Sequence, residues 1–321
     1  MSNPPAVRPI GLDDIKAARA RIAGTVARTP LVKLQSAPDA PQIWLKLENL
    51  QPINAYKLRG AANAVALLGE EERKRGVWTI SAGNAGQGVA YAARQAGVPC
   101  TVVAIETAPE AKRERMRALG ARLVLVSYDR AWQALNDRAY PGVEGTFVHP
   151  FDDHDFIAGH GSIGLEILED LPDVRAVICA IGGGGLLAGV ASAIKAAKPQ
   201  VKMFGVEPET AAPAALSHKM NSPQPFTDWR ASFVDGAGGQ SMFPRMWERI
   251  HPITDDYFVV TLDETRAAMR LLAEKARVIA EGAGALSVAA AVKGLAGNGP
   301  VVAVVSGGNI DLEKFCELVS H

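Results

Sequence analysis

The sequence has few cysteines, no excess of either charge and no long apolar run, and each absence narrows the class of protein. Three cysteines in 321 residues form no CxxC pair, so neither a zinc site nor a redox couple is predicted. Lysine and arginine number 34, as do aspartate and glutamate, so no overall field attracts nucleic acid or an anionic membrane. No apolar run approaches the roughly 18 residues that a membrane span needs. We therefore expect a cytoplasmic protein that acts on a small neutral or zwitterionic ligand, with no nucleic-acid or membrane partner.

Two common catalytic patterns are missing as well. The six histidines show no HExxH or comparable ligand spacing, and no GxSxG nucleophile elbow is present. From these patterns we predict no metal site and no serine-hydrolase chemistry.

What the chain has instead is a regular alternation of short β-branched runs and amphipathic stretches. Strands are predicted in nine runs, QIWLKLE from Gln42, VWTISA from Val77, CTVVAIE from Cys100, ARLVLVS from Ala121, GTFVHP from Gly145, RAVICAI from Arg175, KMFGVEP from Lys202, YFVVT from Tyr257 and VVAVVSG from Val301. This alternation predicts an α/β fold with parallel sheets covered by helices on both faces.

The spacing of these runs suggests two lobes. Compact β-α units fill residues 52–144, whereas the flanking spacings are longer and less regular. We predict a small substrate-gripping domain at 52–144, inserted into a large cofactor-binding domain formed by 1–51 and 145–321. Residues 210–251 show weak periodicity and mixed Pro, Gly and Ser, which is typical of a binding loop.

The most distinctive local feature is a run of four glycines, Gly182 to Gly185, between the strand RAVICAI and the helical LLAGVASAIKAAK. Backbone N–H groups can converge at such a helix N-terminus, where they favour an anion such as phosphate. A flexible turn is the alternative, although a turn needs only one or two glycines. The run matches neither GxGxxG nor GxxxxGK[ST], so dinucleotide or Walker-type binding is not supported.

Three further clusters stand beside predicted strand ends or helix starts. Lys57 stands in a loop just before a helix, close to Lys46 and Arg59. A lysine that forms imines must be partly desolvated or near other cations, and Lys57 fits either case, although a solvated surface lysine would give the same pattern. The string SAGNAGQG, Ser81 to Gly88, offers polar groups for a carboxylate or an ordinary helix cap. The string SGGN from Ser306 follows the last strand. Ligands of open α/β folds collect at the carboxyl edge of the sheet, where these clusters fall.

In this order the clusters resemble those of fold type II pyridoxal-phosphate enzymes, specifically the serine/threonine dehydratase and serine racemase group, whose fold is tryptophan synthase β-like. The similar strings run along nearly the whole chain: TPLVKLQS, KLENLQPINAYKLRGA, SAGNAGQGVAYAA, HPFDD, IAGHGSIGLEIL, GGGGLLAG, GVEPE, VDGAGG, EGAGA and SGGN. The resemblance implies two lobes of parallel sheets with flanking helices, pyridoxal 5'-phosphate as cofactor and a homodimer.

The resemblance also implies cofactor contacts. Lys57 would link to pyridoxal phosphate as an imine and later remove the substrate Cα proton, with Tyr56 lying against the ring. Asn84 would bond to the oxygen of the ring's 3-hydroxyl, and Ser306 would face the pyridine nitrogen. Phosphate binding would fall to the glycine run and the next N–H, that is Gly182, Gly183, Gly184, Gly185 and Leu186.

The implied reaction is that of an ammonia-lyase, which converts an L-β-hydroxy-α-amino acid of the threonine or serine type to a 2-oxo acid and ammonia. Ser81, Ala82 and Asn84 would grip the substrate carboxylate. Racemases of the group carry a second serine where this chain has Ala82, so racemisation with side elimination is disfavoured. The sequence is also compatible with a 3-hydroxyaspartate dehydratase, or with a protein that binds pyridoxal phosphate without catalysis.

Two departures from the family pattern bear on substrate and metal. Ala85 replaces the usual histidine, and with Gly238 in VDGAGG it predicts a wider or less polar side-chain pocket, suited to a bulky substrate such as phenylserine. At the family's divalent-cation site, Glu207 and Ala211 are weak candidate ligands because Pro213 stands at the aspartate position. We therefore predict no strong metal site.

Overall fold

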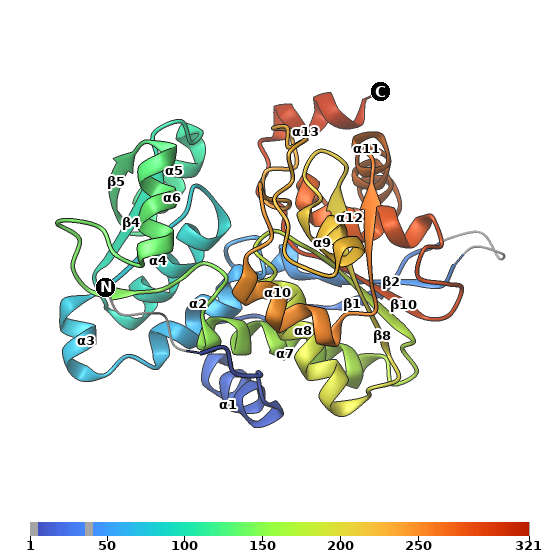
Figure 1. The fold of residues 1–321 in the computed structure, drawn as a ribbon, viewed down its shortest axis with the longest axis horizontal. Coiled ribbons are helices and arrows are strands. Elements are labelled where there is room, and N and C mark those ends of the chain that lie inside the picture. The colour runs from blue at the N-terminus through green and yellow to red at the C-terminus, as the bar shows by residue number, and fades with distance from the viewer. Residues whose placement is uncertain (1–5, 36–40, 321) are drawn as a thin grey trace.

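The computed structural model describes residues 6–35 and 41–320, which form two sheets and their covering helices. Figure 1 shows them as two lobes side by side, with the smaller sheet on the left. Its strands are all parallel, in the order β5–β4–β3–β6, and their bounds are β3 (Val77–Ile80), β4 (Cys100–Ile105), β5 (Arg122–Val126) and β6 (Thr146–Phe147). Helices lead to or connect these strands: α3 (Glu70–Arg75), α4 (Asn84–Ala96), α5 (Glu110–Ala118) and α6 (Tyr128–Asp137).

The larger sheet has six strands in the order β1–β2–β10–β7–β8–β9, parallel except for the edge pair β1–β2. The strands are β1 (Leu31–Lys33), β2 (Ile43–Leu47), β7 (Ala176–Ala180), β8 (Lys202–Pro208), β9 (Asp256–Val260) and β10 (Val301–Val305). The remaining helices are α1 (Leu12–Ile22), η1 (Glu48–Leu50), α2 (Lys57–Ala66), α7 (His154–Asp170), α8 (Gly185–Ala197), α9 (Pro213–Met220), α10 (Pro244–Ile250), η2 (His251–Ile253), α11 (Leu262–Leu271), η3 (Leu272–Ala276), α12 (Gly282–Val292) and α13 (Leu312–Val319).

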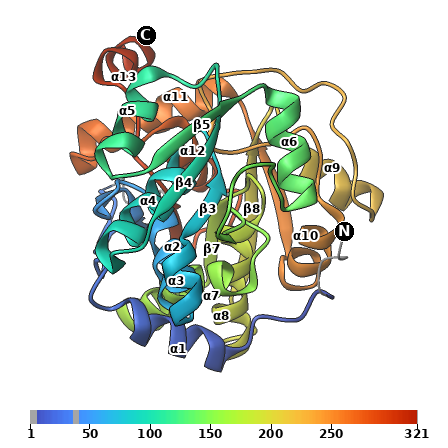
Figure 2. The ribbon, with the colours of Figure 1, turned by 90° about the vertical axis from the view of Figure 1, so that its left-hand side faces the viewer.

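Strand β10 shows why this sheet is covered on both faces. Val302 and Val304 belong to the apolar core shared with α1, α7 and α8, while Val301, Ala303 and Val305 belong to the core shared with α11 and α12. Successive side chains of a strand point to opposite faces, so a run of five buried apolar residues needs helices on each side. Figures 1 and 2 show these two helical layers.

All nine predicted strands are present, and the α/β prediction is confirmed. The strand β1, the antiparallel edge of the larger sheet, has only three residues and was not predicted from the sequence. The prediction of a loop over 210–251 was wrong in part, because α9 and α10 lie in it, while residues 210–212 and 221–243 are irregular apart from one bridge. The smaller sheet extends to β6, just beyond residue 144, and the domain boundaries stay a prediction.

A buried ion-pair cluster fixes the start of α2. Arg59 bonds to Glu48 at 2.8 Å and to Glu166 of α7 at 2.7 Å, and Lys46 bonds to Glu166 at 2.6 Å. Two positive charges, on Lys46 and Arg59, balance two negative charges, on Glu48 and Glu166. Removing one partner from such a buried cluster lowers the free energy of unfolding by about 3–5 kcal/mol. The cluster therefore holds the first turn of α2, which carries Lys57, against α7.

No helix in the part of the chain that the structure describes has the length and apolar character needed to cross a membrane.

Candidate active site

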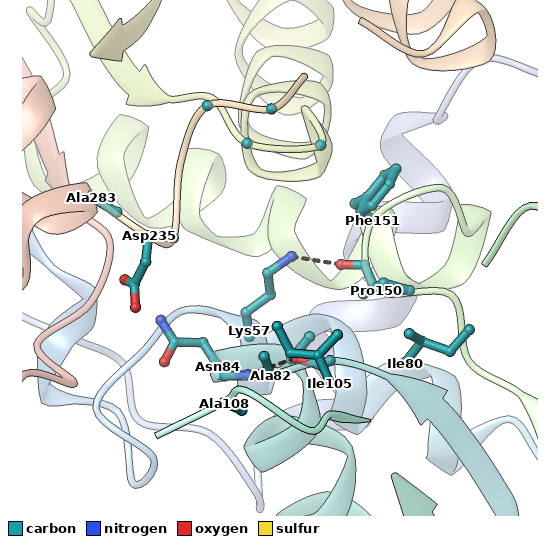
Figure 3. A pocket seen from close by; sticks show the side chains of 18 of the residues that line it. Lys57, Ile80, Ala82, Asn84, Ile105, Ala108, Pro150, Phe151, Asp235 and Ala283 are labelled. Atoms are coloured by element: carbon teal, nitrogen blue, oxygen red, sulfur yellow. Dashed lines mark hydrogen bonds between the residues drawn. The ribbon is translucent and has the colours of Figure 1, made fainter. Parts of the chain in front are cut away.

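A cavity of about 530 Å³ contains most of the predicted site residues. It is lined by loops at the carboxyl ends of strands from both sheets together with the start of α2, and Figure 3 shows part of this lining. The residues predicted from the sequence that line it are Tyr56, Lys57, Ser81, Ala82, Asn84, Ala85, Gly182, Gly183, Gly238 and Ser306. Gly184, Gly185 and Leu186 lie behind this surface, at the start of α8.

Lys57 points into this cavity and donates a hydrogen bond of 2.6 Å from Nζ to the carbonyl oxygen of Pro150, drawn as a dashed line in Figure 3. Its ammonium lies 5.2 Å from the centre of the Tyr56 ring. Burial lowers the pKa of Lys57 to about 7, because the charged form loses its hydration. The expectation that Lys46 and Arg59 activate it was wrong, since both cations bond to the buried carboxylates of the ion-pair cluster.

The glycine run is required by close packing and by backbone conformation. A Cβ on Gly183 would lie 2.2 Å from Cγ of Phe151, and a Cβ on Gly182 would lie 3.1 Å from the carbonyl oxygen of Gly236. Gly184 has φ +88°, a conformation that favours glycine, and serves as the N-cap of α8. The first N–H groups of a helix lack intrahelical partners, so the cavity side of this run can hold an anion.

The loop between β3 and α4 presents small polar groups to the cavity. Ser81 accepts a hydrogen bond of 3.1 Å from the N–H of Gly83, which shapes the turn before α4. Asn84 is the first residue of α4, and its amide bonds to two side chains from beyond the smaller sheet, Glu281 at 2.7 Å and Asn309 at 2.7 Å. The Asn84 amide is therefore held from both of its ends.

Two more predicted residues complete the polar side. Ser306 follows β10, is buried, and donates a hydrogen bond of 3.4 Å from its hydroxyl to the carbonyl oxygen of Ala283. Gly238 has φ +72°, and a Cβ there would lie 2.6 Å from the carbonyl oxygen of Ala211. That contact and that conformation require glycine at 238.

Part of the cavity lining is apolar, and its residues were not predicted from the sequence. We call this surface the apolar wall, and it consists of Ile80, Ile105, Trp132, Leu135, Phe151 and Phe243. The ring centres of Trp132 and Phe243 lie 5.4 Å apart, and those of Phe151 and Phe243 lie 5.0 Å apart. Residues from α6 and from the segment before α10 thus meet at one end of the cavity.

Charged residues that sequence reasoning missed also face the cavity. Lys112 of α5 forms an ion pair with Asp235, and Glu281 is a buried carboxylate. Burial and the nearby Asp235 raise the pKa of Glu281 to about 7. The VDGAGG and EGAGA strings, noted for their glycines, contain Asp235 and Glu281, whereas Lys112 had no signal in the sequence.

The weak metal candidates lie outside this cavity lining. Glu207 is fully buried, and its two carboxylate oxygens accept hydrogen bonds from the N–H groups of Ala214, at 3.1 Å, and Ala215, at 2.9 Å. Burial raises the pKa of Glu207 to about 8. The carboxylate therefore caps the N-terminus of α9, beside Ala211. No group of three or more His, Cys, Asp or Glu suited to a metal is found among residues 6–35 and 41–320.

The fold and the site together indicate which class of enzyme this protein belongs to. Two α/β lobes enclose a lysine of lowered pKa, and a glycine-lined helix start faces the same cavity. This arrangement is that of an enzyme whose lysine binds a phosphate-bearing aldehyde cofactor.

Comparison with known proteins identifies the family. The chain matches the family of pyridoxal-phosphate dependent enzymes over residues 22–307. It is 41% identical over 316 residues to an L-threonine ammonia-lyase of Thermotoga maritima, covering 97% of this chain and 78% of the relative. It is 37% identical over 322 residues to a catabolic L-threonine dehydratase of Staphylococcus aureus strain USA300, covering 97% and 92%. The solved structure of maize serine racemase superposes with a TM-score of 0.90 at 30% identity, covering 97% of each chain.

The chain therefore belongs to the pyridoxal-phosphate dependent enzymes, and pyridoxal phosphate is its cofactor. These comparisons confirm the assignment to the family from sequence motifs, the two-lobed α/β fold and the prediction of pyridoxal phosphate as cofactor.

Proposed function

We propose that this enzyme is an ammonia-lyase that converts an L-β-hydroxy-α-amino acid to a 2-oxo acid and ammonia, with a preference for an apolar side chain bulkier than that of threonine, as in phenylserine. The observation that carries the proposal is the position of Lys57, which shares one cavity with the glycine run and the apolar wall. The relatives named above, an ammonia-lyase and a dehydratase, support the reaction type.

The residues present fit the cofactor. Gly182 and Gly183 allow the chain to pack closely against Gly236 and Phe151, where a Cβ would not fit, and so bring the start of α8 to the cavity. The N–H groups from Gly182 to Leu186 would hold the phosphate without a basic side chain. Asn84 would bond to the ring's 3-hydroxyl oxygen, Tyr56 would lie against the ring and Ser306 would face the ring nitrogen. When bound, pyridoxal phosphate withdraws electrons from the α-carbon of the substrate.

The protein's own part in the reaction centres on Lys57. A pKa of about 7 makes roughly half of this amine neutral at pH 7, so its Nζ can accept the proton from the substrate Cα. The N–H groups around Ser81, Ala82 and Asn84, at the start of α4, would hold the substrate carboxylate. The β-hydroxyl then leaves with a proton as water. The resulting enamine tautomerises to an imine, which water hydrolyses to the 2-oxo acid and ammonia.

The side-chain preference follows from the apolar wall. With the small Ala85 and Gly238 lining the cavity, a substrate held by its carboxylate has room for a group larger than methyl. Burying a phenyl group against apolar side chains stabilises a complex by about 1.5–3 kcal/mol, whereas a methyl group gains only about 0.8 kcal/mol. The wall therefore favours an aromatic or large aliphatic β-substituent over the methyl of threonine.

Racemisation and the dehydration of 3-hydroxyaspartate are less well supported. Racemisation needs a second acid or base on the other face of Cα, and the methyl group of Ala82 cannot exchange a proton. A 3-hydroxyaspartate would bring a second carboxylate into the cavity. The cations among the described lining residues are Lys57, which the reaction uses, and Lys112, which is already paired with Asp235.

The test is to assay the loaded enzyme for 2-oxo acid and ammonium with L-serine, L-threonine, 3-hydroxyaspartate and L-threo-phenylserine, followed by chiral analysis of the remaining substrate. We expect both products from a β-hydroxy amino acid and no D-isomer. Accumulation of the D-isomer without 2-oxo acid would establish a racemase instead, and no turnover of any substrate would favour a cofactor-binding protein without catalysis.

Three further expectations stay predictions. We expect a homodimer, a cytoplasmic location and a small lobe at 52–144. Light scattering of the purified protein tests the first, and limited proteolysis between the lobes tests the third.

A further inference from the structure

Glu281 is a buried carboxylate that the proposed reaction does not use. It is 4% exposed, stands at the N-cap of α12 and lines the cavity. Its backbone N–H donates a 3.1 Å hydrogen bond to the carbonyl oxygen of Gly307, next to Ser306. A Cβ on residue 307 would lie 2.2 Å from Oε1 of Glu281, so a glycine at this position leaves room for the carboxylate.

A directed chain of hydrogen bonds ends at this carboxylate. Arg115 of α5 donates to Oδ1 of Asn309 at 3.1 Å, Asn309 donates from Nδ2 to Oδ1 of Asn84 at 2.7 Å, and Asn84 donates from Nδ2 to Oε1 of Glu281 at 2.7 Å. A guanidinium group only donates, so Arg115 fixes the orientation of the Asn309 amide, and Asn309 in turn fixes that of Asn84. When ionised, the Glu281 carboxylate only accepts and reinforces this orientation. The Asn84 amide cannot rotate by 180° without losing two bonds.

We propose that Glu281 is a positioning residue that orients the Asn84 amide and supplies negative charge beside the cofactor ring. An amide nitrogen carries two hydrogens. Glu281 takes one of them, and the second is then aimed in a fixed direction, available to the ring's 3-hydroxyl oxygen. This inference rests on the family's cofactor and is independent of which substrate the enzyme prefers.

The charge of Glu281 depends on the groups around it. Asp235 faces it from the loop before Gly236 and raises its pKa, as does burial, while the Asn84 bond and Lys112 of α5 lower it. Tyr56, the N-cap of α2, lies close enough for the charge of Glu281 to raise its pKa, and Lys57 is the next residue. With a pKa of about 7, the carboxylate gains its charge as the pH rises through neutrality. The absorbance of the bound cofactor should follow that change.

The experiment compares Glu281→Gln, which keeps the shape and one acceptor oxygen, with Glu281→Ala, which removes the acceptor. Each is loaded with pyridoxal phosphate, and cofactor affinity and visible absorbance are measured across neutral pH without substrate. The matched control is Glu274→Gln, an exposed carboxylate paired with Arg270. Asn84→Ala and the Asn84→Ala/Glu281→Ala double variant show whether Glu281 acts through Asn84.

We expect Glu281→Ala to bind the cofactor about tenfold more weakly, in line with loss of one charge-assisted hydrogen bond. Glu281→Gln should restore most of the affinity but lose the absorbance change near neutral pH, and Glu281→Ala should have no further effect once Asn84 is alanine. Wild-type affinity and an unchanged pH profile in both Glu281 variants would overturn the proposal. If circular dichroism shows that Glu281→Ala does not fold, the pH profile of Glu281→Gln decides alone.

Discussion

The Nζ of Lys57 bonds at 2.6 Å to the carbonyl oxygen of Pro150, and the next residue, Phe151, fills the space that Gly183 leaves. One loop after β6 thus contacts both Lys57 and the glycine run. In the proposed site, this loop would set the cofactor-linking lysine and the phosphate-binding glycines relative to each other.

The lowered pKa of Lys57 predicts how cofactor loading depends on pH. Before the cofactor binds, the amine is protonated below pH 7 and neutral above it, and only the neutral amine attacks an aldehyde. The rate of pyridoxal phosphate binding to the cofactor-free protein should rise with pH through about 7 and then level off. An ordinary lysine would keep gaining up to about pH 10.4, so a rate that still climbs steeply above pH 8 would contradict the lowered pKa.

The glycine run predicts a steric effect at one position. Gly183→Ala places a methyl group into the Phe151 ring, and overpacking of this kind costs about 1–3 kcal/mol, so cofactor affinity should fall roughly 5- to 150-fold. Gly24→Ala is the control, since a Cβ there meets nothing within 4 Å. Equilibrium titration with pyridoxal phosphate measures both variants, and an unchanged affinity in Gly183→Ala would remove the run from phosphate binding.

The capping role of Glu207 predicts that the enzyme works without a divalent cation. Both carboxylate oxygens are bonded to backbone N–H groups of α9, so a cation would have to displace two hydrogen bonds. Treatment with a chelator, followed by assay with and without added magnesium, should leave turnover within about twofold, a difference of under 0.5 kcal/mol. A large loss that magnesium restores would show that a metal site exists.

The apolar wall predicts a change in substrate preference. Trp132→Ala shortens the wall, and loss of one large apolar contact should lower kcat/KM for phenylserine by about 10- to 200-fold while changing that for threonine little. Tyr128→Ala is the matched control, because Tyr128 stacks on Trp132 from the exposed side of α6 and does not line the cavity. Equal losses on both substrates would mean that Trp132 supports the fold and does not select the substrate.

The sequence allowed the sheets and the polar half of the site to be predicted for physical reasons. Buried parallel strands are short β-branched runs, and the glycine run at the start of α8 is consecutive, so both features are contiguous in the chain. Lys57, Asn84 and Ser306 each stand beside such a contiguous feature. All three line one cavity, but Asn84 follows a strand of the smaller sheet and Ser306 a strand of the larger one, so only the packing of the two lobes brings them together.

The apolar wall and Glu281 could not be predicted in the same way. Ile80, Leu135 and Phe243 come from three separate segments, and in the sequence each looks like an ordinary core residue. Glu281 reads as a helix cap, and only the fold shows that its carboxylate meets Asn84 across 197 positions of sequence. The prediction that Lys46 and Arg59 act on Lys57 failed because they are close to it in the sequence, but their charges bond to the buried carboxylate of Glu166 instead.

In the proposed function, Lys57 and the apolar wall together make a lyase for bulky β-hydroxy amino acids. The most direct test is kcat/KM for release of 2-oxo acid and ammonium from L-threo-phenylserine, L-threonine and L-serine, with Lys57→Ala as the control that should lose nearly all turnover. We predict the highest value for phenylserine, exceeding that for threonine by about tenfold or more. A clear preference for serine, or turnover retained by Lys57→Ala, would contradict this claim.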